Sequence, residues 1–163
     1  MHTFSIDVHS LQETQLFGVQ LAEVLRIGDV IALIGDLGAG KTHLTQAIAK
    51  QLGVDPEEVN SPTFVLIQEY DGDVPVCHID AYRLNDTDEF LELGADELLG
   101  ADNICLIEWA DRVADVLPKR LIRIEIETIG ETSRRISLKC PLDREAEIRN
   151  KVCSSEESKS SDG

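Results

Sequence analysis

The hydrophobic positions of this chain follow two periods that alternate along it. Residues 30–35 (VIALIG) form a continuous apolar run, which is typical of a strand buried on both faces. Residues 120–128 (RLIRIEIET) alternate between apolar and polar, which is typical of a strand with one exposed face. Elsewhere apolar residues recur at helical spacing, as they do after Ser10, which forms a capping-box pattern with Glu13. The pattern predicts strands and helices in alternation.

The predicted elements define an α/β fold. We expect strands at residues 3–8, 30–35, 63–70, 75–80, 103–108, 120–128 and 134–140. We expect helices from Ser10 to Gly28, at 41–52, in two pieces within 86–99, at 109–117 and at 143–152. Alternation of this kind indicates a mainly parallel central sheet between helices, a three-layer arrangement, with antiparallel strands added at an edge. The predicted single domain spans residues 1–152, and residues 153–163 are predicted to be a disordered acidic tail.

The net charge argues against strong autonomous binding to nucleic acid. The 163 residues contain 15 Lys and Arg against 31 Asp and Glu, a formal net charge of −16. Such a field repels a phosphate backbone, although a local nest of amides with one lysine can still bind a nucleotide. The charge favours a partner with a basic surface, and simple solubility explains it equally well. The basic residues of the terminal hairpin are interpreted as solvated side chains.

The cysteines and the apolar runs indicate in which cellular compartment the protein is expected. The four cysteines are far apart and form no CxxC pair, so they do not indicate a zinc site or a disulfide framework. Cys77 and Cys105 lie within apolar runs and are interpreted as small buried hydrophobes. No apolar run approaches the roughly 20 residues that span a bilayer, and the N-terminus lacks the pattern of a secretory signal. We therefore expect a cytoplasmic protein without a membrane segment.

A phosphate-binding loop is the most specific motif of the chain. Residues 35–42 (GDLGAGKT) match G-x-x-x-x-G-K-[ST], follow a buried strand and open a helix. Glycines let successive N–H groups surround the phosphates, and the helix adds the positive end of its dipole. Lys41 is expected to neutralise the β- and γ-phosphates, and the Thr42 hydroxyl to ligate Mg²⁺. The predicted nucleotide-binding residues of this loop are Asp36, Leu37, Gly38, Ala39, Gly40, Lys41 and Thr42.

Two acidic residues at strand ends are candidates for the chemistry of hydrolysis. Glu108 ends ICLIE, and Asp80 ends VCHID. Ligands of open α/β sheets bind at the carboxyl ends of the strands, where both residues are expected. One of them is expected to hold Mg²⁺ and the other to position water or sense the γ-phosphate, and periodicity does not decide which. His78 is interpreted as a packed strand residue rather than a ligand.

Two further features have both a functional and a structural interpretation. The segment Ser61-Pro62-Thr63-Phe64 is either a switch that responds to the γ-phosphate or a turn that leads into a strand. Trp109, the only tryptophan, either packs near the nucleotide or a partner surface, or belongs to the core. The sequence leaves both alternatives open.

Four motifs together resemble one family. GDLGAGKT (35–42), SPTF (61–64), HIDAYRL (78–84) and IEWADR (107–112), in this order and spacing, resemble the TsaE (YjeE) family. The resemblance spans roughly residues 8–140 and implies a P-loop NTPase-like fold. It also implies a Mg²⁺-dependent ATPase, weak alone, that supports the TsaD–TsaB complex in forming threonylcarbamoyladenosine at position 37 of tRNA. The tRNA would be held mainly by those partners.

The resemblance also assigns roles to individual residues. Lys41 and Thr42 would serve phosphate and magnesium, Glu108 would serve magnesium, and Asp80 would be a catalytic or sensing carboxylate. Thr63 would belong to a switch-like loop that contacts the nucleotide, and Trp109 would lie close to the nucleotide.

Three other functions compete with this interpretation. A GTPase is disfavoured because no N/T-K-x-D motif follows the P-loop. A small-molecule kinase is disfavoured because segment 84–102, where an Arg-rich lid is expected, contains no Lys or Arg. A nucleotide-gated scaffold with little hydrolysis stays open, because no residue is identified that positions the attacking water and no arginine finger is identified.

Overall fold

Seven strands form one sheet at the centre of the molecule. The computed structural model describes residues 2–36, 38–60 and 66–160. The strands are β1 (His2–Val8), β2 (Val30–Gly35), β3 (Ile67–Asp71), β4 (Pro75–Asp80), β5 (Ile104–Glu108), β6 (Ile122–Thr128) and β7 (Arg134–Cys140). Their order across the sheet is β1-β7-β6-β2-β5-β4-β3. Strands β6, β2, β5 and β4 pair in parallel. At one edge β7 pairs antiparallel with both β6 and β1, and at the other edge β3 pairs antiparallel with β4. The predicted mainly parallel sheet with antiparallel edge strands is confirmed.

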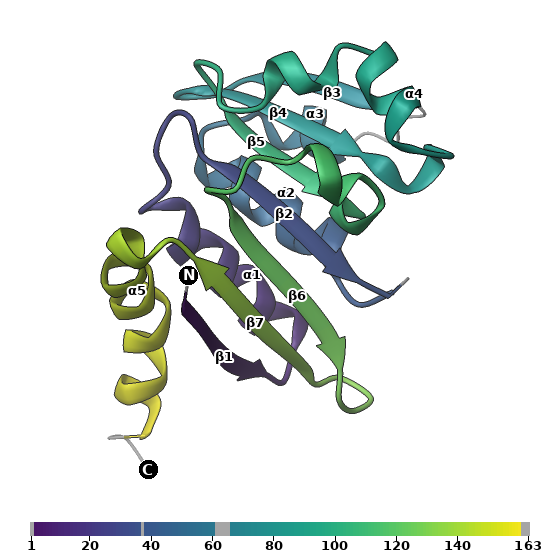
Figure 1. Cartoon of the computed structure of the whole chain (residues 1–163). Coiled ribbons are helices and arrows are strands. Elements are labelled where there is room, and N and C mark those ends of the chain that lie inside the picture. The colour runs from purple at the N-terminus through teal and green to yellow at the C-terminus, as the bar shows by residue number, and fades with distance from the viewer. Residues whose placement is uncertain (1, 37, 61–65, 161–163) are drawn as a thin grey trace.

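Helices pack on both faces of the parallel strands. The α-helices are α1 (Leu11–Ala22), α2 (Lys41–Gln51), α3 (Pro56–Asn60), α4 (Thr87–Glu92) and α5 (Leu142–Ser160). Three 3₁₀-helical segments are η1 (Ala81–Arg83), η2 (Ala95–Leu98) and η3 (Ala110–Val116). The parallel strands β2, β5 and β6 all run toward the right-hand edge of the molecule, where α2 begins (Figure 1).

Two hydrophobic cores lie on opposite faces of the sheet. The larger joins α1, α2 and α5 to one face, through buried side chains such as Phe17, Leu44 and Ile148. The smaller joins α4, η2 and η3 to the other face around Phe90 and Ile107. The parallel half is therefore a three-layer structure, as predicted. Over β6 the exposed and buried residues alternate, so that the antiparallel half presents a polar face to solvent.

One predicted helix ends earlier in the structure, and another is of a different type. α1 ends at Ala22 rather than at Gly28. The N–H groups of Val24 and Leu25 still donate to carbonyls in the last turn of the helix. Beyond them the helical bonds stop: Arg26 donates to the carboxylate of Asp29 (2.8 Å), and Gly28 donates to the carbonyl of Asn103 (2.7 Å). The segment after β5 is 3₁₀-helical instead of α-helical, and it is kinked at Val113, which has a non-helical φ of −126°.

The C-terminal helix is longer than the pattern predicts. α5 extends to Ser160, whereas the prediction ended it at Val152 and treated residues 153–163 as disordered. Residues 153–160 contain no Gly or Pro, so no residue there interrupts the helix. Residues 161–163 lie outside the described residues. The helix is anchored at its start by the buried Arg144, which donates to Asp29 at 2.8 and 3.1 Å.

Cys77 and Cys105 are both buried and face each other in the register of β4 and β5, which confirms their interpretation as small core residues. Among the described helices, none combines the length and hydrophobicity that crossing a bilayer requires.

Truncation of a side chain in this core tests the packing. Leu106, on the interior strand β5, is fully buried, whereas Leu142, at the start of α5, is 62% exposed. We expect Leu106→Ala to lower the free energy of unfolding by about 2–5 kcal/mol, because it leaves a cavity between sheet and helices. Leu142→Ala, the matched control, should change it by less than about 0.5 kcal/mol. Urea denaturation followed by circular dichroism measures both, and equal effects would contradict the described core.

Candidate functional site

The loop between β2 and α2 depends on glycine at two positions. A Cβ at Gly35 would lie 2.7 Å from the carbonyl oxygen of Ile126 on β6, so only glycine fits there. Gly40 caps α2 in the left-handed conformation, with φ 110°, and its cap has no side-chain hydrogen bond. The first N–H groups of this 11-residue helix therefore lack a side-chain cap, which is the arrangement that binds anions at helix N-termini.

Lys41 is held inside the loop. Its side chain is buried, and its ammonium donates to the carbonyl oxygens of Gly35 and, at 2.9 Å, of Asp36. The same nitrogen lies 3.9 Å from the centroid of the Trp109 ring, a cation–π contact. Burial lowers the pKa of Lys41 below its usual value of 10.5, and nearby carboxylates, Glu108 foremost, oppose this shift. A phosphate that binds Lys41 must compete with the two carbonyls and with the indole ring.

Glu108 lies beside the loop with both carboxylate oxygens engaged. The pairing of β2 with β5 places Glu108 opposite Leu33, close to the start of the loop. The Thr42 hydroxyl donates to Glu108 Oε1 at 3.1 Å, and His78 Nε2 lies 2.6 Å from Glu108 Oε2. The Glu108 side chain is 7% exposed. A hydroxyl and a carboxylate in contact are oxygen donors of the kind that Mg²⁺ prefers, so these residues fit the predicted metal.

Asp80 is the register partner of Glu108 on the neighbouring strand β4. One of its oxygens, Oδ1, accepts from the backbone N–H of Tyr82 at 3.0 Å and so caps η1. Both acids lie at the carboxyl ends of parallel strands, as expected. Of the two, Glu108 contacts Thr42, which favours Glu108 as the metal-binding carboxylate.

The backbone at Trp109 turns its ring toward the loop. Trp109 has φ 59°, and no other non-glycine residue in the described part of the chain has a positive φ. Such a conformation is strained for a bulky residue and indicates a functional constraint. The ring lies 4.9 Å from that of Tyr82 and contacts Lys41. Trp109 is also partly buried against the smaller core, so it contacts both the loop and the core, and its place beside a nucleotide stays a prediction.

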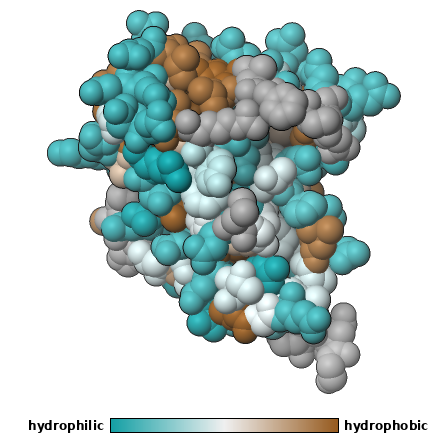
Figure 2. All heavy atoms as spheres, turned by 90° about the vertical axis from the view of Figure 1, so that its right-hand side faces the viewer, coloured by the Kyte–Doolittle hydropathy of each residue, from teal (hydrophilic) through white to brown (hydrophobic). Residues whose placement is uncertain are grey.

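Two cavities flank the loop at this edge of the sheet. One, of about 240 Å³, is lined by Gly38, Gly40, Lys41, Thr42, His43, Glu108 and Trp109. The other, of about 280 Å³, is lined by Ser10, Leu11, Thr14, Gly38, Ala39, Gly40, His43, Glu131, Thr132 and Arg134. Figure 2 faces this edge, where pale, weakly polar atoms occupy the middle of a largely hydrophilic surface. The loop glycines and His43 line both cavities, so the two cavities are neighbours across the loop.

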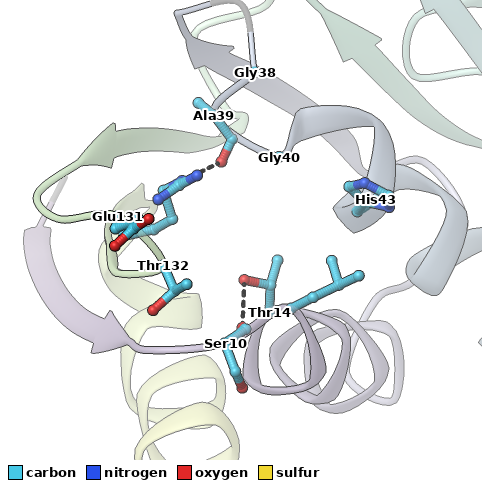
Figure 3. Close-up of a pocket in the computed structure, with 10 residues that line it drawn as sticks. Ser10, Thr14, Gly38, Ala39, Gly40, His43, Glu131 and Thr132 are labelled. Carbon is cyan, nitrogen blue, oxygen red and sulfur yellow. Dashed lines mark hydrogen bonds between the residues drawn. The ribbon is translucent and has the colours of Figure 1, made fainter.

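The second cavity is built by segments far apart in the sequence. Figure 3 shows Ser10 and Thr14 at the start of α1, the loop residues above them, and Glu131 and Thr132 on the turn between β6 and β7. The guanidinium of Arg134 donates to the carbonyl oxygen of Ala39 at 3.2 Å and ties this turn to the loop. The sequence pattern did not predict this cavity, because it indicated a helix cap at Ser10 and solvated side chains for the basic residues of the terminal hairpin, which include Arg134. Ser10 does cap α1, accepting from the N–H of Glu13 at 3.1 Å.

Two predicted site residues lie outside the described residues. These are Leu37, in the loop, and Thr63, in the SPTF segment. The predicted switch role of that segment stays a prediction.

The chain is similar to proteins of known family over most of its length. A family model described as "Threonylcarbamoyl adenosine biosynthesis protein TsaE" matches residues 8–136. A relative named "tRNA threonylcarbamoyladenosine biosynthesis protein TsaE", from Bacillus subtilis (strain 168), is 42% identical over 127 residues, 77% of this chain and 78% of the relative. A relative of the same name from Treponema pallidum (strain Nichols) is 36% identical over 129 residues, 79% of this chain and 95% of the relative. The crystal structure of Bacillus subtilis YdiB matches with a TM-score of 0.77 at 29% identity, covering 95% of this chain and 97% of that one.

The lowered pKa of Lys41 predicts how ATP affinity changes with pH. Burial lowers the pKa of the ammonium, and contact with phosphate raises it, so ATP binding takes up a proton between the two values. The affinity should therefore fall as pH rises toward 10.5, and the fall should begin at a lower pH than the ordinary lysine pKa would give. Isothermal titration calorimetry in buffers of different ionisation enthalpy measures both the affinity and the proton uptake.

Lys41→Arg is the matched control, because its guanidinium stays charged across this range. Any binding that it retains should show no proton uptake. A wild-type affinity that is constant over the range would contradict the assignment of Lys41 to the phosphates.

Proposed function

The chain belongs to the TsaE family of threonylcarbamoyl adenosine biosynthesis proteins, and on that premise we propose that it is a Mg²⁺-dependent ATPase. Its ATP cycle would support the formation of threonylcarbamoyladenosine at position 37 of tRNA. The observation that carries the proposal is the contact between Thr42 and Glu108, with Lys41 lining the same cavity. Phosphate, metal and strand-end carboxylate meet at such a site in P-loop hydrolases.

Lys41, Thr42 and Glu108 have distinct tasks in this proposal. Lys41 exchanges the carbonyls of Gly35 and Asp36 for the β- and γ-phosphates, while the N–H groups at the start of α2 bind phosphate oxygens. Thr42 and Glu108 are the residues that would hold the metal ion. When bound, Mg²⁺ neutralises the charge that develops on the phosphates.

The position of the carboxylate also orients the nucleotide along the loop. The γ-phosphate and the metal belong beside Glu108, in the first cavity. The nucleoside must then leave on the other side of the loop, where the second cavity opens between α1 and the β6–β7 turn. We therefore assign the base and ribose to the cavity of Figure 3.

A partner is expected to complete the active site. Among the described residues that line the cavity of Lys41 and Glu108 there is no arginine. Asp80 is the candidate for a catalytic or γ-phosphate-sensing carboxylate, since it is the register partner of Glu108. We infer low activity alone and stimulation by the TsaD–TsaB complex, which would also hold the tRNA that the net charge of −16 repels. We place this reaction in the cytoplasm.

ATP hydrolysis by the purified chain, alone and with TsaD–TsaB, tests this function. We expect slow turnover alone and marked stimulation by the partners. Lys41→Ala should lower the stimulated rate by at least about 10²-fold, because a preorganised charge at the phosphates is lost. Lys50→Ala, an exposed lysine on the same helix, is the matched control and should keep the wild-type rate. If the chain binds ATP but TsaD–TsaB do not increase its slow hydrolysis, the result would support the scaffold alternative.

Filling the second cavity tests the assignment of the nucleoside. Thr132 is an exposed residue on the rim of that cavity, so Thr132→Trp should obstruct it without disturbing the core. We expect ATP affinity to fall at least about tenfold, roughly 1.4 kcal/mol, while the affinity for inorganic tripolyphosphate is unchanged. Glu127→Trp, on the exposed face of the same hairpin, is the control. Calorimetry with both ligands measures this, and an equal loss for both ligands would refute the assignment.

A further inference from the structure

His78 contacts the carboxylate that is assigned to the metal. Its Nε2 lies 2.6 Å from Glu108 Oε2, while the Thr42 hydroxyl donates to the other oxygen, Oε1, at 3.1 Å. A carboxylate oxygen only accepts, so Nε2 of His78 carries the hydrogen of this bond. The side chains of His78 and Glu108 are 17% and 7% exposed. Few water molecules can therefore reach the two side chains and compete for this hydrogen bond.

The sheet register brings the imidazole to this position. Parallel pairing of β4 with β5 sets Asp80 opposite Glu108 and His78 opposite Leu106. Side chains two residues apart on a strand share a face, so His78 lies diagonally across from Glu108 on the same face. His78 is a packed strand residue, as the sequence predicted, but the group against which it packs is the functional carboxylate.

The two bonds distinguish the two oxygens of Glu108. A free carboxylate can rotate and present either oxygen, or both, to a cation. Here His78 retains Oε2, so Oε1 is the oxygen that shares a contact with Thr42, the second predicted metal ligand. His78 belongs to β4, which is not part of the phosphate-binding loop, so its contact does not depend on the conformation of that loop.

We propose that His78 is a positioning residue, which holds Glu108 so that Oε1 faces the metal beside Thr42. This role rests on the proposed function, because it requires a metal at Thr42 and Glu108. Partners of metal-binding carboxylates outside the coordination shell commonly change metal affinity by 10–100-fold when they are removed. His78 touches neither phosphate nor metal in this role, and it acts through Glu108 alone.

Metal binding to the nucleotide complex tests the proposal without relying on turnover. His78→Leu removes the donor at similar volume, whereas His78→Gln retains an N–H donor. The affinity for Mn²⁺ is measured by electron paramagnetic resonance with ADP bound, and the affinity for ADP is measured by calorimetry in EDTA. We expect His78→Leu to weaken Mn²⁺ binding by about 10–100-fold and to leave metal-free ADP binding unchanged. His78→Gln should recover most of the loss.

Two further variants separate positioning from a general effect on the strand. Cys77→Ala changes a buried residue on the opposite face of β4 and should leave Mn²⁺ affinity unchanged. If His78→Leu does not fold, His78→Asn takes its place, because its shorter amide does not reach the carboxylate. Wild-type Mn²⁺ affinity in His78→Leu or His78→Asn, or an equal loss in His78→Gln, would overturn the proposal. Failure of the wild-type protein to bind ADP would instead refute the proposed function.

Discussion

Parallel pairing of β2, β5 and β4 is the constraint on which the rest of the site depends. In the register of these strands Leu33 lies opposite Glu108, and Glu108 lies opposite Asp80. The loop that follows β2 and both carboxylates therefore reach the same edge of the sheet. Parallel strands require crossover connections, and these connections supply α2 on one face of the three strands and α4 with η2 on the other. The fold and the site are consequences of the same pairing.

The carbonyl groups of the phosphate-binding loop accept hydrogen bonds from Lys41, the lysine of the same loop. Lys41 bonds to two loop carbonyls and stacks on Trp109, whose strained backbone places the ring there. Phosphate binding therefore exchanges one set of contacts for another, so the net gain is smaller than the attraction between ammonium and phosphate by itself. Trp109 also contacts Tyr82, which follows Asp80 and β4. Through these contacts Lys41 is connected to the segments that follow β5 and β4.

The antiparallel half of the sheet has a separate task. Its hairpin closes one side of the second cavity, and Arg134 joins its turn to the loop at Ala39. Glycine at position 35 permits the end of β2 to lie close to β6, because a Cβ there would collide with the carbonyl oxygen of Ile126. Its remaining face is polar and open, in contrast to the three-layered parallel half. The hairpin therefore contributes to the site only through the turn between β6 and β7 and through Arg134 beside it.

The sequence by itself determined what local chemistry can specify. The sequence predicted the glycine pattern of the loop, the buried strands that end in Asp80 and Glu108, and the alternation of strands and helices. Each of these features depends on residues that are neighbours along the chain. Tertiary structure alone decided which distant residues complete the site. Ser10, Thr132 and Arg134 meet the loop only because β6 pairs with β2 and α1 packs on α2. His78 reaches Glu108 only through the register of β4 with β5, a property of strand pairing that the sequence pattern on each strand does not contain.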